Sequence, residues 1–133
     1  MSDILKLMVP GKPEYVRTVR LAVSSLADNA GFDIEAVEDI KVAVSEACSN
    51  IVCHGEADKE NVYKVICEIL NDRIEILVED EAGGYDTRKY IEPQVGQIKE
   101  GGLGIFIIKA LMDEVDILSE LGVGTRIRMI KKL

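Results

Sequence analysis

The stretch VYKVICEILNDRIEILVED, residues 62–80, decides the fold class of this chain. Its two halves, 62–70 and 73–80, are rich in aliphatic and β-branched residues, and the Asn-Asp pair between them favours a tight turn. In the second half, apolar residues alternate with charged ones, so one face of that strand is apolar. The apolar face consists of Ile74, Ile76 and Val78. The stretch therefore predicts an antiparallel hairpin with one buried face.

Further elements are predicted on both sides of this hairpin. Pro13 suits the first turn of a helix, Gly31 a helix end, and Asp33 a helix cap. Strands that pair mainly as hairpins, with helices elsewhere in the chain, indicate an α+β two-layer sandwich. The additional elements are an edge strand at 4–9, helices at 13–29, 35–54 and 103–113, and strands at 114–120 and 125–133.

Length and composition limit the classes of function that this chain can have. A chain of 133 residues predicts one domain, 1–133. The net charge of −8 argues against direct binding of nucleic acid and suits a basic protein partner. No apolar run reaches the roughly 20 residues that cross a bilayer, and the N-terminus lacks the pattern of a secretion signal. Three cysteines, Cys48, Cys53 and Cys67, are interpreted as reduced core thiols, so we expect a cytoplasmic protein without membrane contact.

The helix at 37–54 carries a carboxylate and an amide beside its core stripe. Glu46 and Asn50 are four residues apart and point the same way, about a quarter-turn from the core face. They fit either a solvated polar stripe or the oxygen-rich edge of a cleft, where they could serve a nucleophile and Mg²⁺. The core face itself is predicted to consist of Ile40, Val44, Ala47 and Ile51.

Asp80 continues the apolar phase of its strand, so its carboxylate is aimed inward. A buried carboxylate needs a donor, although a strand that simply ends here explains the position as well. The two glycines that follow, Gly83 and Gly84, allow a flat ligand to approach the backbone. Thr125 also faces inward, and it is interpreted as a core threonine unless it accompanies Asp80 in a pocket.

The segment EGGLGIFIIKALMDEV, 100–115, has three glycines before and at the start of a helix. Amide groups at a helix N-terminus form a site for anions when no side chains cover them. Many helices begin with glycine, so this pattern is weak by itself.

The order of these segments resembles the nucleotide-binding domain shared by histidine kinases, gyrase-type ATPases and related chaperones. IKVAVSEACSNIVCHG (40–55) resembles the N box, VEDEAGGYD (78–86) the first glycine box, and 100–115 the second. The segment VPGKPEYVRTVRLAVSSLADNAGF (9–32) is similar to the bacterial anti-sigma-factor serine-protein kinases of stress response and sporulation. The resemblance implies the Bergerat-type fold, a mixed and mostly antiparallel sheet with helices on one face.

The resemblance also implies roles for individual residues. Glu46 would be the general base and Asn50 the Mg²⁺ ligand, while Asp80 would accept a hydrogen bond from the adenine amino group of ATP. Residues 85–101 would form a lid. Arg20 would contact protein partners. The remaining implied nucleotide-binding residues are Gly84 and Thr125 beside the base, and Lys99, Gly102, Leu103 and Gly104 at the phosphates.

Two positions depart from the family pattern. Ala82 stands where the first glycine box normally has a glycine, and Glu100 stands where some relatives have an arginine. The implied activity is that of an ATP-dependent serine/threonine-protein kinase and anti-sigma factor, which binds and inhibits a sigma factor. The implied partners are that sigma factor, an antagonist protein of the STAS type as substrate, and a second copy in a homodimer. The alternatives are a module that sequesters a sigma factor without catalysis, and a switch kinase that acts on a scaffold or antagonist without sigma binding.

Overall fold

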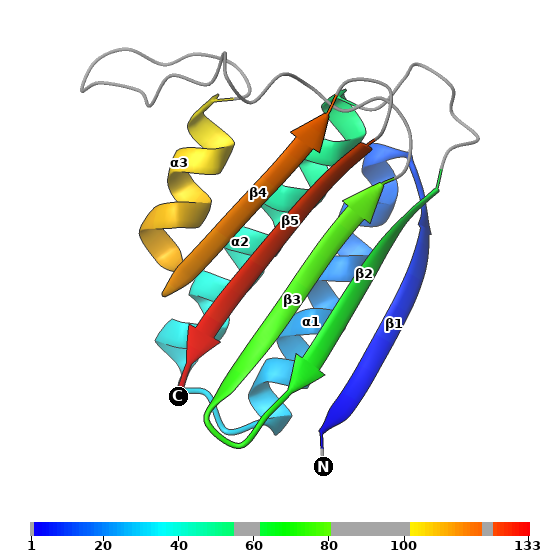
Figure 1. Cartoon of the computed structure of the whole chain (residues 1–133). Coiled ribbons are helices and arrows are strands. Elements are labelled where there is room, and N and C mark those ends of the chain that lie inside the picture. The colour runs from blue at the N-terminus through cyan, green and yellow to red at the C-terminus, as the bar shows by residue number, and fades with distance from the viewer. Residues whose placement is uncertain (1, 55–61, 81–101, 121–123) are drawn as a thin grey trace.

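The computed structural model describes residues 2–54, 62–80, 102–120 and 124–133. The described residues form five strands, three α-helices and one 3₁₀ turn (Figure 1). In chain order these are β1 (Asp3–Pro10), η1 (Pro13–Tyr15), α1 (Val16–Asn29), α2 (Ile34–His54), β2 (Val62–Ile69), β3 (Arg73–Asp80), α3 (Gly102–Leu111), β4 (Glu114–Glu120) and β5 (Gly124–Lys132).

The strands form one sheet in the order β1-β2-β3-β5-β4, with β1 at an edge as expected. The four described pairings are all antiparallel, in line with the expected mostly antiparallel sheet, although no parallel pair occurs among the described strands. The three α-helices cover one face of this sheet (Figure 1). The predicted α+β two-layer sandwich is therefore confirmed.

The core lies between the sheet and the helices, because both layers present their apolar stripes there. The predicted core face of α2 is confirmed, since its members are at most 3% exposed. The alternating residues of β3 are fully buried. These two sets are Ile40, Val44, Ala47 and Ile51, and Ile74, Ile76 and Val78.

Local signals place the ends of the helices where the sequence predicts them. Gly31 follows α1 with a φ of 98°, a conformation that costs glycine little. Asp33 caps α2, because its Oδ1 accepts a hydrogen bond of 2.8 Å from the backbone N–H of Ala36. The first helix differs slightly from expectation: Pro13 opens a 3₁₀ turn, and the α-helix begins at Val16.

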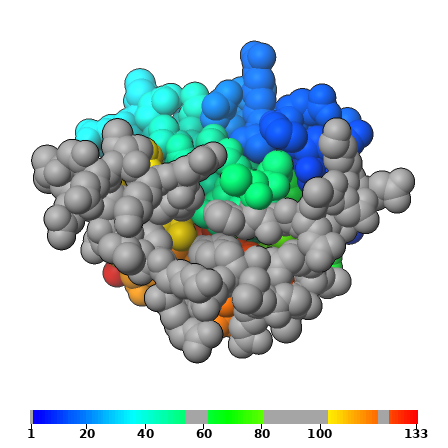
Figure 2. Space-filling model, turned by 90° about the horizontal axis from the view of Figure 1, so that it is seen from above, coloured from blue at the N-terminus to red at the C-terminus, as the bar shows by residue number. Residues whose placement is uncertain are grey.

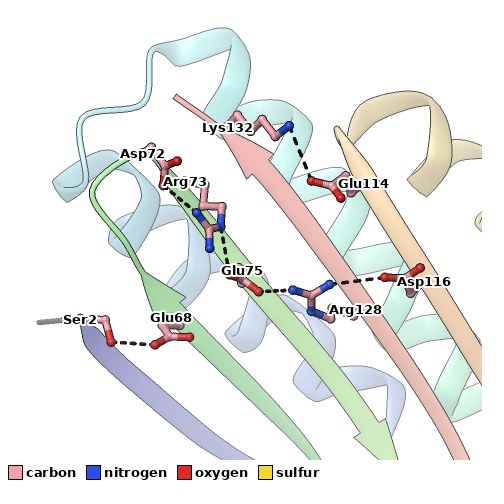
Figure 3. A network of polar contacts seen from close by, with 9 residues as sticks. All are labelled: Ser2, Glu68, Asp72, Arg73, Glu75, Glu114, Asp116, Arg128 and Lys132. Atoms are coloured by element: carbon pink, nitrogen blue, oxygen red, sulfur yellow. Dashed lines mark hydrogen bonds and ion pairs between the residues drawn. The ribbon is translucent and has the colours of Figure 1, made fainter.

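The other face of the sheet carries charged side chains (Figure 3). Glu75 of β3 accepts hydrogen bonds from Arg73 and Arg128, and Arg128 also reaches Asp116 of β4. Exposed ion pairs contribute little to stability, so this network marks the solvent side of the sheet. The helices of the described ranges include none that is both long and apolar enough to span a bilayer.

One of the three cysteines departs from the expectation that all of them lie in the core. Cys48 and Cys67 are buried in the core, whereas Cys53 is exposed. Cys53 lies in the last turn of α2, on the stripe of Glu46 and Asn50. All three thiols are free.

Candidate functional site

Four element ends meet at one end of the molecule. The C-terminal part of α2, the N-terminus of α3, the end of β3 and the start of β5 all lie at the top of Figure 1. Figure 2 looks down on this end, where the end of α2 (green) lies between α1 (blue) and a part of α3 (yellow). The predicted residues of the described ranges, apart from Arg20, belong to these four element ends.

Glu46 of α2 lies against the first turn of α3. A Cβ atom on Gly104 would be 3.0 Å from Oε2 of Glu46, closer than most such contacts allow. Gly104 therefore leaves room for the carboxylate. Gly102, Leu103 and Gly104 all belong to the first turn of α3, whose free amide groups favour negative charge nearby.

Asn50 lies one helical turn after Glu46 and is only 6% exposed. Its Oδ1 is buried and has no hydrogen-bond partner among the described residues. An amide oxygen left in this state is destabilising by about 1–3 kcal/mol, so its position suits a ligand that supplies the missing contact. A carbonyl oxygen of this kind is a suitable ligand for Mg²⁺.

The described residues include no group of three or more His, Cys, Asp or Glu side chains that could hold a metal ion by themselves. Mg²⁺ usually takes one or two protein ligands together with substrate phosphates and water. Asn50 fits such a role.

Asp80 and Thr125 are direct partners across β3 and β5, so their side chains lie on the same face of the sheet. Thr125 is 2% exposed, which confirms that its hydroxyl faces inward. The structure therefore places together the two residues that were expected at the base of a nucleotide.

Two further polar residues belong to the same level of the sheet, and the sequence analysis missed both. Ser119 of β4 is buried, and its Oγ lies 2.8 Å from Oγ1 of Thr125. Tyr63 of β2 is the cross-strand partner of Asp80 and is 1% exposed. Ser119 follows Val115 and Ile117 in the inward phase of its strand, and that alternation was the available signal.

Burial governs the titration of the groups under this end of α2. It raises the pKa of the Cys48 thiol from 9.0 to about 12, against a smaller opposing effect of the Tyr63 hydroxyl. Burial likewise raises the pKa of Tyr63 above its ordinary value. The two groups are thus neighbours, but their geometry falls short of a full hydrogen bond, and Oη of Tyr63 has no such partner within the described ranges. Both groups stay protonated at neutral pH.

Some predicted residues are not tested by this geometry. Gly84, Lys99 and the expected lid at 85–101 lie outside the described residues, as do both departures from the family pattern. Arg20 lies on α1 and is half-buried, and its role in contacting partners stays a prediction.

Comparison with known proteins agrees with this arrangement. Residues 9–131 match the family described as the histidine kinase-like ATPase domain. The chain is 41% identical over 130 residues to the serine-protein kinase RsbW of Oceanobacillus iheyensis, a match that covers 91% of this chain and 82% of the relative. It is 37% identical over 131 residues to the serine-protein kinase RsbW of Bacillus subtilis, with coverages of 92% and 82%.

Two solved structures share the fold. A crystal structure of the RsbU and RsbW domains of a Mycobacterium tuberculosis protein superposes with a TM-score of 0.73 and 22% identity, covering 98% of this chain and 32% of the other. The histidine kinase domain of a blue-light activated kinase from Erythrobacter litoralis has a TM-score of 0.61 and 17% identity, with coverages of 93% and 61%.

Proposed function

The chain belongs to the histidine kinase-like ATPase family and, within it, to the RsbW serine-protein kinases, and from this premise we propose that it phosphorylates an anti-sigma-factor antagonist. The donor is ATP with Mg²⁺, and the acceptor is a serine or threonine hydroxyl of the antagonist. The same chain binds a sigma factor and blocks it. Once phosphorylated, the antagonist can no longer release the sigma factor from this chain.

The main observation in support of this proposal is the close contact between Glu46 and Gly104. It brings a carboxylate to the helix N-terminus that would hold the phosphates, one helical turn from Asn50. Phosphoryl transfer depends on positioning and electrostatics more than on covalent chemistry with the protein. A carboxylate beside the phosphates can orient the attacking hydroxyl and accept its proton.

The other residues hold the nucleotide in this proposal. The amides of Gly102, Leu103 and Gly104 bind phosphate oxygens at the start of α3. Asn50 contributes an oxygen to Mg²⁺, which supplies positive charge to the phosphates when bound. Asp80 and Thr125 contact the base.

A module that only sequesters a sigma factor is the main alternative. Such a module has no use for a carboxylate at a helix N-terminus or for an orphaned amide oxygen one helical turn away from it, so Glu46 and Asn50 favour the kinase. The net charge of −8 suits a basic partner such as a sigma factor. A homodimer remains an expectation from the resemblance.

The proposal is tested by incubating the purified chain with radiolabelled ATP, Mg²⁺ and antagonist proteins encoded by neighbouring genes. We expect label on a serine or threonine of one antagonist, and none with Glu46→Gln. Nucleotide binding without transfer to any antagonist would favour the sequestering module. Co-purification with sigma subunits of RNA polymerase separates the anti-sigma kinase from a switch kinase without sigma binding.

A further inference from the structure

Lys131 is a charged residue on the face of the sheet that the helices cover. The inward phase of β5 includes Ile127 and Met129, which are fully buried. Lys131 continues this phase near the end of the strand, and its side chain is 16% exposed. An ammonium group beside a core is unfavourable unless it is paired and hydrogen-bonded, so its partners show what holds it there.

The ammonium group of Lys131 joins the two helices of the candidate site. Its Nζ donates a hydrogen bond of 2.6 Å to the backbone carbonyl of Leu111, the last residue of α3. It also lies 3.3 Å from Oδ2 of Asp39 on α2. The last carbonyl groups of a helix lack intrahelical partners and carry partial negative charge, so a cation is favourable there. Lys131 therefore connects β5 with both α2 and α3.

This connection and the contact of Glu46 with Gly104 lie at opposite ends of one helix pair. α2 and α3 run in opposite directions, because the C-terminal part of α2 and the N-terminus of α3 lie at the same end of the molecule (Figure 1). On α2, Asp39 precedes Glu46 by seven residues. On α3, Gly104 precedes Leu111 by seven residues. The two contacts are therefore matched, about two turns or roughly 10 Å apart along each helix.

The apolar contacts of α3 fix its depth better than its position along α2. Ile105 and Ile108 are at most 2% exposed and hold the helix against the core, but hydrophobic burial is non-directional. The helix has ten residues, fewer than a helix needs to be stable by itself. Hydrogen bonds depend on angle as well as distance, so the bonds of Lys131 at the end of α3 oppose a shift of α3 along α2.

We propose that Lys131 is a positioning residue for phosphoryl transfer, an inference that rests on the proposed kinase function. Through Asp39 and Leu111 it holds α3 in register with α2. That register sets where the first turn of α3, with its phosphate-binding amides, lies relative to the Glu46 carboxylate. Lys131 acts only through this register, from the opposite end of the helix pair.

Lys131→Met removes the charge and the donors and keeps an unbranched side chain. We expect kcat for phosphorylation of the antagonist to fall about 5- to 10-fold, since a small misplacement of a reacting group has a large effect on rate. The KM for ATP should change less than about twofold, because the amides that bind the phosphates move together with α3. Lys131→Arg keeps the charge and the donors, and it should recover most of the rate.

Lys132→Met is the matched control, because it removes the same charge from the next residue. Lys132 points to the other face of the sheet, where its Nζ lies 3.6 Å from Oε2 of Glu114 in an exposed ion pair (Figure 3). Loss of such a pair has little effect on a protein, so kcat should stay at the parent value.

A measurement without nucleotide tests the register directly. Backbone amide chemical shifts of residues 102–104 report the surroundings of the first turn of α3. Lys131→Met should move these resonances from two turns away, and Lys132→Met should leave them in place. A loss of stability alone does not move the resonances of the folded protein.

A double-mutant cycle links Lys131 to the contact at the other end of the helices. Gly104→Ala already displaces the Glu46 carboxylate, so Lys131→Met should lower kcat less in this background than in the parent. If Lys131→Met fails to fold, Asp39→Asn weakens the link to α2 while Lys131 keeps its bond to Leu111. The same fall in kcat is then expected.

The outcomes are distinguishable. An unchanged kcat in the folded Lys131→Met or Asp39→Asn variant overturns the role of Lys131 while the kinase proposal stands. So do unmoved resonances at 102–104, or an equal fall in kcat in the Gly104→Ala background. A parent protein that transfers no phosphate to any antagonist overturns both proposals.

Discussion

Oε2 of Glu46 lies 3.0 Å from the position that a Cβ atom on Gly104 would occupy. Glu46 lies on α2 and Gly104 lies on α3, 58 positions later in the chain. Only the packing of these two helices brings the carboxylate so close that a side chain on residue 104 would collide with it. This contact links the predicted base to the predicted phosphate site.

Gly104→Ala is expected to reduce phosphoryl transfer about 10-fold, because small displacements of a reacting group have large effects on rate. The added methyl group must push the Glu46 carboxylate aside by a few tenths of an ångström. Steady-state kinetics should show a fall in kcat with a smaller change in KM for ATP. In a Glu46→Gln background, Gly104→Ala should reduce the rate of phosphoryl transfer little further. An equal loss of rate in both backgrounds would show that Gly104 does not act through Glu46.

Glu46→Gln is expected to retain ATP binding and to lose transfer by at least about 10²-fold, the effect of removing a general base. Calorimetry would measure binding, and incorporation of labelled phosphate would measure transfer. Glu38→Gln is a suitable control, because Glu38 lies on the same helix in an exposed ion pair with Lys41. Unchanged transfer by Glu46→Gln would reject the assigned role.

Asn50→Ala is expected to raise the Mg²⁺ concentration for half-maximal activity by about 10-fold or more, since even outer-shell changes weaken metal binding on this scale. The apo protein should melt at the same temperature or higher, because the Oδ1 atom that is removed is buried without a partner in the described structure. Mg²⁺ titration of activity and thermal melting test the two parts. A large loss of stability with an unaltered Mg²⁺ requirement would assign Asn50 to the core instead.

Tyr63→Phe is expected to leave the free energy of unfolding unchanged or to raise it by up to about 1 kcal/mol, because the hydroxyl is buried without full hydrogen bonding. Chemical denaturation of the parent and the variant gives the comparison. A clear destabilisation would show that the contact with Cys48 is a genuine hydrogen bond.

Alkaline pH is expected to destabilise the protein through its buried thiols. Burial raises the pKa of Cys67 from 9.0 to about 12, so between these values the unfolded thiol has lost its proton while the folded one retains it. The unfolded state then binds fewer protons, and the free energy of unfolding falls as pH rises from about 9 to 12. Cys67→Val should show a shallower fall in melting temperature over this range. Equal slopes for both proteins would mean that other groups control the alkaline transition.

Much of the fold followed from local patterns. The hairpin at 62–80 is correct because its alternation and turn residues act within neighbouring residues. The capping by Asp33 and the positive φ at Gly31 are likewise local properties of the chain. The mostly antiparallel character of the sheet was also expected, whereas the start of α1 at Val16 was less predictable, since packing decides how a helix begins.

The site was only partly predictable. Resemblance to a known family identified Glu46, Asn50, Asp80 and Thr125, whereas nothing in that pattern pointed to Ser119. Cys53 was placed in the core because its neighbours are apolar, but the direction of a side chain at the end of α2 depends on where the neighbouring layer stops.

The sequence alone determined the α+β class, the helix caps, the inward phase of Asp80 and Thr125 and the family, because periodicity, turn chemistry and motif order act along the chain. Only the tertiary structure decided that Gly104 makes room for Glu46, that Asn50 keeps an unpartnered oxygen, and that Ser119 reaches Thr125. These are distances between elements, and they are set by the pairing of strands and the packing of helices rather than by any single segment.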